Sequence, residues 1–336
     1  MSPTHATSHL KWYNDTVRQL LTKEELHLLM QKSDWRGTVE VAYIWIWVFF
    51  AFFLAWYRPG IITIPLALII LGGKQLACAI IMHDTSHNSL FQSSFLNEFI
   101  GQWMGAYPIM LDMNRYRPYH MQHHITTGTD DDPDISLTRG YPTTAWSMFR
   151  KFLRDMSGVT GIVAQIAILG MHFGYIKFEL GGKINRLRQQ ISSKERITTA
   201  IQNLAGPLCA QLVLFALISF IFDPWVYLLW IGSLLTTYNW SLRVRSIAEH
   251  SCVTDRNDPH LNTRTIYASW PERMLFAPLY VNFHAEHHLL MAAPPYAYPK
   301  LHWILKERGY FQKGLIEKGY GNILKMAIKG KDTSPS

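Results

Sequence analysis

Histidines gather in three short segments of this 336-residue chain, at His83–His87, His120–His124 and His284–His288. The second and third have the pattern H-x-x-H-H, and the first has the pattern H-x-x-x-H. Residues three and four apart lie on one face of a helix, so the imidazoles of each segment can converge on a metal ion. A lone histidine is more often structural, but eight of the fifteen histidines in such segments favour metal binding.

The number of histidines limits which metal sites the chain could form. Imidazole binds zinc, copper, iron and nickel, so the ligand type alone does not identify the metal. A structural zinc takes four ligands, and eight converging histidines therefore suggest two metals. No stretch has the H-E-x-x-H pattern of zinc proteases. A redox metal pair beside lipid-facing helices indicates oxygen chemistry on a lipid. The alternative outside the enzyme class is a metal-binding transporter or sensor, which would place ligands near the bilayer midplane.

Composition points to a membrane. The apolar fraction is 49% and the mean hydropathy only +0.01, but the apolar residues gather in long runs that basic residues flank. The net charge of +8 accompanies no nucleic-acid-binding pattern, so we expect no nucleic-acid partner. Three widely spaced cysteines form no disulfide framework and suit a reducing cytoplasm. The first 35 residues have no signal-peptide pattern.

Four apolar runs have nearly the length of about 20 residues that a membrane span needs. They cover residues 41–57, 61–82, 205–222 and 225–242. Each pair is joined by a tight turn, so they predict two transmembrane hairpins. For the first pair the alternative is a hairpin buried in a soluble core. Polar residues interrupt residues 90–111, which we interpret as interfacial or re-entrant. They also interrupt residues 146–175, which we interpret as an interfacial helix in preference to a span.

The distribution of lysine and arginine predicts the orientation. The two hairpin turns are poor in these residues, so we place both termini, the central segment and the three histidine segments in the cytoplasm. Lys74 is expected to mark where the second span leaves the hydrocarbon, with His83 about 13 Å beyond it. The predicted fold is an all-α integral membrane protein with four transmembrane helices and a cytosolic helical cap. In a bacterium it would lie in the inner membrane.

We divide the chain into a cytosolic N-terminal segment (1–38), a catalytic domain (39–326) and a flexible tail (327–336). In the first, Thr22 and Glu25 form a capping-box pattern that predicts the start of a helix. Residues 177–196 are strongly basic, which fits contact with anionic lipid headgroups and equally a solvated loop.

The segments HDTSH, HMQHH and HAEHH resemble those of the membrane-bound fatty acid desaturase and hydroxylase superfamily. The likeness extends over about residues 35–310 and includes the flanking HNSLF after His87, the acidic run Asp131–Asp134 and the RSIAEH that ends at His250. It implies a di-iron centre held by histidine and O2-dependent attack on an unactivated C–H bond of an acyl chain. Desaturation is the outcome we expect. A hydroxylase or an alkene-forming decarboxylase, acting on fatty acid, carotenoid or sphingolipid, is the alternative.

The resemblance assigns nine iron ligands by position. They are His83, His87, His120, His123, His124, His250, His284, His287 and His288. His250 stands outside the three segments. At seven residues past Arg243 it reaches roughly 10 Å into the cap, a height comparable to that of His83.

Acidic residues near these histidines are expected to accept hydrogen bonds from imidazole N–H groups. The candidates are Asp84, Asp131, Asp134, Glu249 and Glu286. In the acidic turn we expect at least one of Asp131, Asp132 and Asp134 to fix a ligand. For each acid the alternative is a surface charge or a helix cap.

The sequence also bears on how a substrate headgroup could be held and on where the electrons come from. Four arginines could hold an anionic substrate head, although anchoring at the membrane surface explains them better: Arg115, Arg117, Arg243 and Arg245. The chain has no dinucleotide-binding G-x-G-x-x-G motif and no cysteine cluster for iron. Electrons are therefore expected from a separate ferredoxin-, rubredoxin- or cytochrome-type protein.

Overall fold

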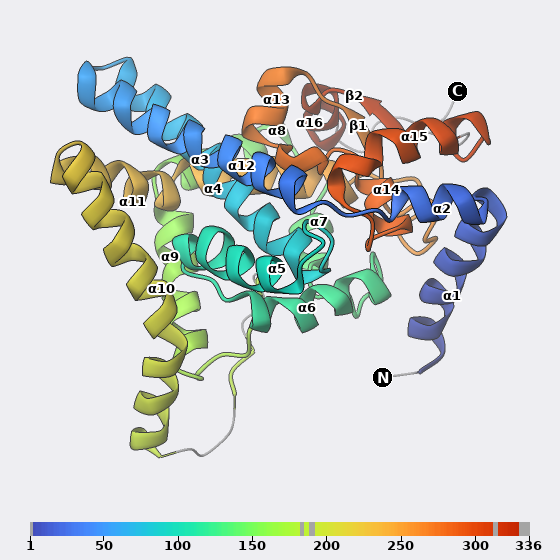
Figure 1. Ribbon diagram of the computed structural model, residues 1–336, viewed down its shortest axis with the longest axis horizontal. Coiled ribbons are helices and arrows are strands. Elements are labelled where there is room, and N and C mark those ends of the chain that lie inside the picture. The colour runs from blue at the N-terminus through green and yellow to red at the C-terminus, as the bar shows by residue number, and fades with distance from the viewer. Residues whose placement is uncertain (1–2, 182–184, 188–191, 312–314, 329–336) are drawn as a thin grey trace.

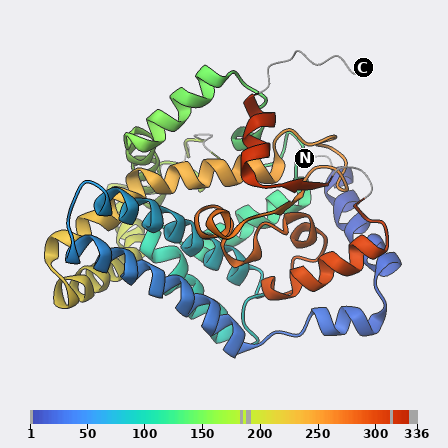
Figure 2. The same cartoon turned by 90° about the horizontal axis from the view of Figure 1, so that it is seen from above.

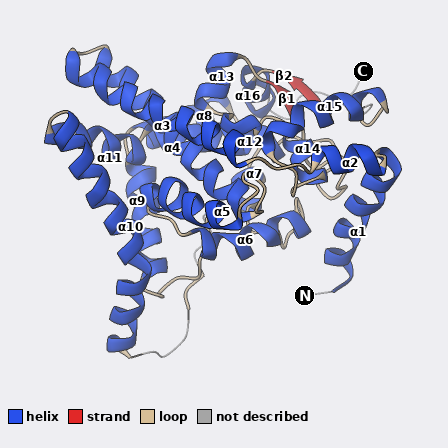
Figure 3. Ribbon diagram, viewed as in Figure 1, coloured by secondary structure: helices blue, strands red, loops and turns tan. Residues whose placement is uncertain are grey.

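The computed structural model describes residues 3–181, 185–187, 192–311 and 315–328. Helices dominate these ranges, as expected (Figure 3). The all-α expectation needs one correction, because β1 (Thr265–Tyr267) and β2 (Ile316–Lys318) form a two-stranded parallel sheet.

The first predicted hairpin is formed by α3 (Asp34–Tyr57) and α4 (Thr63–Ser86), which pack on each other (Figure 1). Buried residues recur along α3 at helical spacing, as at Val41, Ile44 and Val48, while the opposite face exposes large apolar side chains. This division is typical of a helix between a protein core and lipid. By contrast, α4 is buried over most of its length and is the central helix of the fold.

The second hairpin differs from the prediction. Its first helix, α10 (Ser193–Ile221), is long and apolar, but the expected fourth span is divided between α11 (Tyr227–Leu235) and α12 (Thr237–His250). The break lies at Thr236, whose hydroxyl donates to the Gly232 carbonyl at 2.6 Å. The Asn239 side-chain amide donates to the Leu234 carbonyl at 2.9 Å and so satisfies an acceptor at the end of α11.

Residues 90–111 and 146–175, whose apolar runs are interrupted by polar residues, do not form single long helices either. Residues 94–109 form α5 (Ser94–Ile100), a π-helical turn (Gly101–Ala106) and a 3₁₀ turn (Tyr107–Ile109). Further along, α8 (Ala145–Met156) and α9 (Val159–His172) meet at a bend of 63°. Among the described residues, three helices are long and apolar enough to cross a membrane, or four if the α8–α9 pair counts as one span.

The two hairpin turns lie at one end of the molecule, and α1, α2, α14 and α15 lie at the other (Figure 1). A side-chain bond joins the turns, since the Trp56 indole N–H donates to the Asp223 carboxylate at 2.8 Å. Both turns therefore face the same side of any membrane that the hairpins cross.

The N-terminal helices belong to the cap. The capping box of Thr22 and Glu25 starts α2 (Lys23–Leu29), as predicted. Tyr13 and Val17 of α1 (Pro3–Leu20) share a core with Leu301 of α15 (Tyr298–Glu307), so the N-terminal segment packs against the C-terminal region (Figure 2).

Of the proposed flexible tail, Ala327 and Ile328 belong to α16 (Tyr320–Ile328), and 329–336 lie outside the described residues. Parts of the basic segment 177–196 lie outside them as well. The remaining elements are α6 (Met113–Thr126), α7 (Ile135–Thr138), α13 (Trp270–Leu275), α14 (His284–Leu289), and 3₁₀ turns at Pro224–Val226, Pro278–Tyr280 and Pro295–Ala297.

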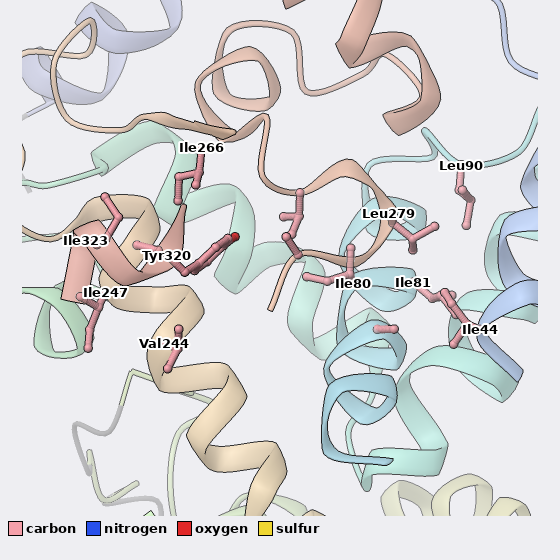
Figure 4. Packing of buried hydrophobic residues seen from close by; sticks show 14 of the residues in the cluster. Ile44, Ile80, Ile81, Leu90, Val244, Ile247, Ile266, Leu279, Tyr320 and Ile323 are labelled. Carbon is pink, nitrogen blue, oxygen red and sulfur yellow. The ribbon is translucent and has the colours of Figure 1, made fainter. Parts of the chain in front are cut away.

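An apolar cluster joins the spans to the cap (Figure 4). It packs Ile80 and Ile81 of α4 against Val244 of α12 and Leu279 of the C-terminal region. Lys74, which we expected to mark the edge of the hydrocarbon, is covered by other parts of the protein. Its side chain is buried where α13 contacts α4.

Candidate metal centre

Four helices carry the nine candidate histidines into one buried region. His83 lies in the last turn of α4 and His87 caps that helix, while His250 ends α12. The H-x-x-H-H segments lie on α6 and α14. The Asp112 carboxylate caps α6 by accepting from the Arg115 amide at 3.0 Å. The segment just before α14 is held by strand β1, because the Ile266 amide donates to the Asn282 carbonyl at 2.8 Å and the Asn282 side chain donates to the Ile266 carbonyl at 2.9 Å.

The histidines form two groups, and within each group the ring nitrogens lie within 4.8 Å of one another. The five-histidine cluster contains His83, His87, His120, His124 and His287. The four-histidine cluster contains His123, His250, His284 and His288. Each H-x-x-H-H segment therefore contributes histidines to both clusters.

The protonation of His250 can be deduced from its surroundings. Its Nδ1 lies 3.0 Å from the main-chain carbonyl oxygen of Asn262, which can only accept. Nδ1 must then carry the proton, and Nε2 presents a lone pair. That lone pair faces His284 Nε2 at 2.9 Å, and His284 Nε2 also faces His288 Nε2 at 3.2 Å. A proton on His284 Nε2 could form a hydrogen bond to His250 Nε2 or to His288 Nε2, but not to both. A metal cation between the three Nε2 atoms could bind all of them.

The five-histidine cluster shows the same pattern. His124 Nε2 lies 3.0 Å from His120 Nε2 and 3.1 Å from His287 Nε2. The buried Nε2 atoms of His83 and His87 have no hydrogen-bond partner within the described part of the chain. Two nitrogens bound at right angles to a metal at about 2.1 Å would lie about 3.0 Å apart. The donor set therefore fits metal ions, and five nitrogens exceed the four of a structural zinc site.

The electrostatic environment keeps most of these imidazoles in the form that binds metal. Burial, with a contribution from His123, lowers the pKa of His250 to about 3. Burial also holds the pKa of His120, His124, His284, His287 and His288 well below the usual value. Such imidazoles are neutral at pH 7, as ligation requires. Burial opposes protonation of His123 too, but the Asp132 carboxylate raises the pKa of His123 to about 9.

The predicted contact of Asp84 with His83 is present, and Asp132 makes the contact that we expected from the acidic turn. Asp84 Oδ1 lies 2.7 Å from His83 Nδ1. In the acidic turn, Asp132 Oδ1 accepts from His123 Nδ1 at 2.8 Å, and Asp134 Oδ2 is 3.8 Å from the same nitrogen. Asp131, which we expected in this role, is exposed and contacts no histidine among the described residues. The turn directs Asp132 inward because the Gly128 amide donates to its other oxygen at 2.8 Å.

The two glutamates have different positions. Glu249 Oε1 forms an ion pair with Arg245 Nε at 2.7 Å and lies 3.6 Å from His284 Nδ1. Burial raises the pKa of Glu249 to about 7 although Arg245 opposes the shift. Glu286, expected to orient a ligand, instead contacts His302 Nδ1 at 2.5 Å. It lies between His284 and His287 in sequence, but its side chain leaves the opposite face of α14.

Two contacts to the clusters were not predicted. One is the Asn262 carbonyl at His250, and the other is the Tyr298 hydroxyl, 2.9 Å from His287 Nδ1. Tyr298 is fully buried and follows His288 by ten residues. No motif marks either residue, because each meets its histidine only through tertiary packing.

The four arginines considered for a substrate head all have partners within the chain. Arg243 forms a two-pronged ion pair with buried Asp155, and Arg245 pairs with Glu249. Arg117 pairs with Glu98, and Arg115 donates to the Met171 carbonyl at 2.9 Å. Arg115, Arg117 and Arg243 therefore join helices, and the Arg245–Glu249 pair lies within α12.

A cavity of about 90 Å³ adjoins the clusters. Its walls include apolar and aromatic side chains, among them Met82, Leu111 and Leu242, together with Tyr116 and Tyr238. Histidines of both clusters reach it: His120, His123, His250 and His284. Asp134, Arg245 and Glu249 also line the cavity, and its apolar and aromatic walls suit a segment of an alkyl chain.

Comparison with known proteins agrees with this arrangement. A sequence model of the fatty acid desaturase family ("Fatty acid desaturase") matches residues 59–318, so the chain belongs to that family and is an oxidoreductase of the desaturase type. The sn-1 oleoyl-lipid 12-desaturase of Synechocystis sp. (strain ATCC 27184 / PCC 6803 / Kazusa) is 23% identical over 303 residues, which cover 88% of this chain and 80% of the relative.

Two further relatives have similar identity. The sn-1 oleoyl-lipid 12-desaturase of Anabaena variabilis is 23% identical over 243 residues, covering 69% of this chain and 66% of the relative. The dihydrorhizobitoxine desaturase of Bradyrhizobium elkanii is 24% identical over 285 residues, covering 81% and 74%. The prediction of a desaturase made from the histidine segments is confirmed.

Proposed function

We propose that the chain is an integral membrane di-iron enzyme that uses O2 to introduce a double bond into an acyl chain of a membrane lipid. The observation that carries this proposal is the pair of histidine clusters beside an apolar cavity. The two relatives named as oleoyl-lipid desaturases support a lipid-linked acyl substrate. The five-histidine and four-histidine clusters would each hold one iron.

The overall reaction removes two hydrogens from adjacent carbons and consumes O2, two electrons and two protons, giving an alkene and two waters. Bound iron would supply the redox chemistry that activates O2. The protein residues provide position and shelter. Tyr116, Tyr238 and their apolar neighbours exclude water from the alkyl chain, and Asp132 and Tyr298 hold the imidazoles of His123 and His287 in fixed orientations.

The proposal includes a membrane orientation and an electron source. Both hairpin turns would face the outside, with both termini and the metal centre in the cytoplasm, because lysine and arginine gather there. Electrons would come from a separate ferredoxin-, rubredoxin- or cytochrome-type protein that docks on the cap.

The test is lipid mass spectrometry of a host that expresses the chain, compared with hosts expressing His124→Ala or His27→Ala. We expect new unsaturated acyl chains with the wild type and His27→Ala, whose exposed side chain lies outside both clusters. His124→Ala should give none and should bind less iron. Hydroxylated chains in place of alkenes would refute desaturation, and full iron content in His124→Ala would refute the metal assignment.

A further inference from the structure

A second cavity, of about 200 Å³, lies between α3, α4 and α13. Lys74 and Tyr43 lie on its walls with Met274, and Glu40 and Arg273 also line it. None of the described residues that line it is a histidine, and it shares no lining residue with the cavity beside the clusters. It is therefore a separate site.

The Lys74 side chain is the central feature of this cavity. Only 1% of the residue is exposed, and its ammonium nitrogen contacts the Met274 sulfur at 3.4 Å and lies 5.8 Å from the centre of the Tyr43 ring. No carboxylate of the described residues forms an ion pair with it. Burying an ammonium group without an anionic partner costs free energy. We therefore expect an anion to bind beside Lys74.

The cavity has too few acceptors for its donors. The Tyr43 hydroxyl also points to the Met274 sulfur, at 3.4 Å. A thioether is a weak acceptor, yet here it faces both an ammonium and a phenol. The Glu40 carboxylate also lines the cavity, but among the described residues it forms no ion pair with Lys74 and interacts instead with Tyr280. An oxyanion between Lys74 and Tyr43 would give both donors a strong acceptor.

The surroundings place the cavity at the boundary between the spans and the cap. A Cβ at Gly73 would lie 2.7 Å from the Met274 carbonyl oxygen, so α13 rests directly on α4 here. Trp270 is 54% exposed and packs edge-on against Trp47 of α3 at 6.0 Å. Tryptophan and tyrosine are enriched at the headgroup level of membranes. Arg273 is exposed at the same place and adds a second positive charge.

We propose that this cavity binds the anionic headgroup of an acyl lipid, either the phosphate of a glycerophospholipid or the carboxylate of a free fatty acid. Lys74 and Tyr43 donate to the oxyanion, and Arg273 contributes charge at the rim. The acyl chain follows the exposed apolar face of α3 past Ile46 and Phe50. Basic pockets between transmembrane helices on the cytoplasmic side bind anionic lipid headgroups.

Native mass spectrometry of the delipidated full-length protein in neutral detergent tests this site. Phosphatidylglycerol, phosphatidylcholine, oleate and inorganic phosphate are titrated separately. The variants are Lys74→Met, which keeps the side-chain length, and Arg273→Gln and Tyr43→Phe, which alter exposed residues. Lys300→Met, at an exposed lysine outside the cavity, is the matched control.

We expect phosphatidylglycerol or oleate to bind, with affinity about tenfold lower in Lys74→Met and several-fold lower in Arg273→Gln and Tyr43→Phe. Lys300→Met should match the wild type. The lipid that shows this dependence identifies the source of the oxyanion. Equal binding of phosphatidylcholine, binding of inorganic phosphate alone, or unchanged affinity in Lys74→Met would overturn the proposal. Since binding is measured without turnover, the outcome is independent of the proposed desaturation.

Discussion

The Asp132 carboxylate offers the sharpest test of how the metal centre is held. Its Oδ1 accepts from His123 Nδ1 at 2.8 Å and from the Asp134 amide at 2.9 Å, and its Oδ2 accepts from the Gly128 amide at 2.8 Å. Asp132→Asn keeps the shape but replaces one oxygen by an NH2 group. In either orientation of the amide, a donor then faces a donor, at Gly128 or at His123.

The effect of Asp132→Asn on metal binding can be estimated from the loss of this hydrogen bond to His123. Removing a partner that orients a ligand histidine lowers metal affinity by roughly 10–100-fold. That factor corresponds to about 1.4–2.8 kcal/mol. The affected ligand belongs to the four-histidine cluster, so we expect Asp132→Asn to lose iron from that cluster first and to retain about one iron per chain during mild chelation.

The assay is iron per folded chain, measured by metal mass spectrometry along a chelator titration. Asp131→Asn is the matched control, since it makes the same chemical change at an exposed position one residue away. The reasoning fails if Asp132→Asn and Asp131→Asn follow the same chelation curve as the wild type.

Three further predictions concern topology, the ninth histidine and helix packing. Single cysteine substitutions of Gly60 and of Asp223 should react with membrane-impermeant thiol reagents added from outside, and a cysteine in place of Asp130 should not. Reaction of the Asp130 variant alone would contradict the proposed orientation. His250→Ala should leave about one iron per chain by metal mass spectrometry, and retention of two with full turnover would show a structural role. Gly72→Val should lower the unfolding temperature, because its Cβ would lie 2.4 Å from Thr237 Oγ1. The expected cost is about 1–3 kcal/mol, with Gly60→Val, whose Cβ has no neighbour closer than 3.8 Å, as the control.

The sequence predicted the local elements of the metal centre well. Helical spacing placed the imidazoles of each H-x-x-H-H segment on one helix face, and the height of His250 above Arg243 predicted that it lies in the cap near the other candidate histidines. The division into five and four was not foreseen. It depends on how α6 and α14 face each other across the centre, which is a tertiary property that spacing does not encode.

The errors have particular physical causes. Residues 225–242 are apolar throughout, but Thr236 and Asn239 bond to main-chain carbonyls and divide the helix. A hydropathy pattern does not register such bonds. The charge of Lys74 in an apolar run gave no sign that α13, 200 residues further along, covers its side chain. Asp131 and Asp132 differ only in which side of one turn they occupy.

The division of the clusters between α6 and α14 also affects biosynthesis. Neither cluster is complete until the ribosome has passed His288, although His83 and His124 are made much earlier. At about 5–20 residues per second, the 160 residues from His124 to His284 take roughly 8–32 s. During that interval the Asp84 and Asp132 contacts can already form, since each joins residues close in sequence. Nascent chains arrested before His284 should therefore bind iron weakly, and chains released after His288 should bind it tightly.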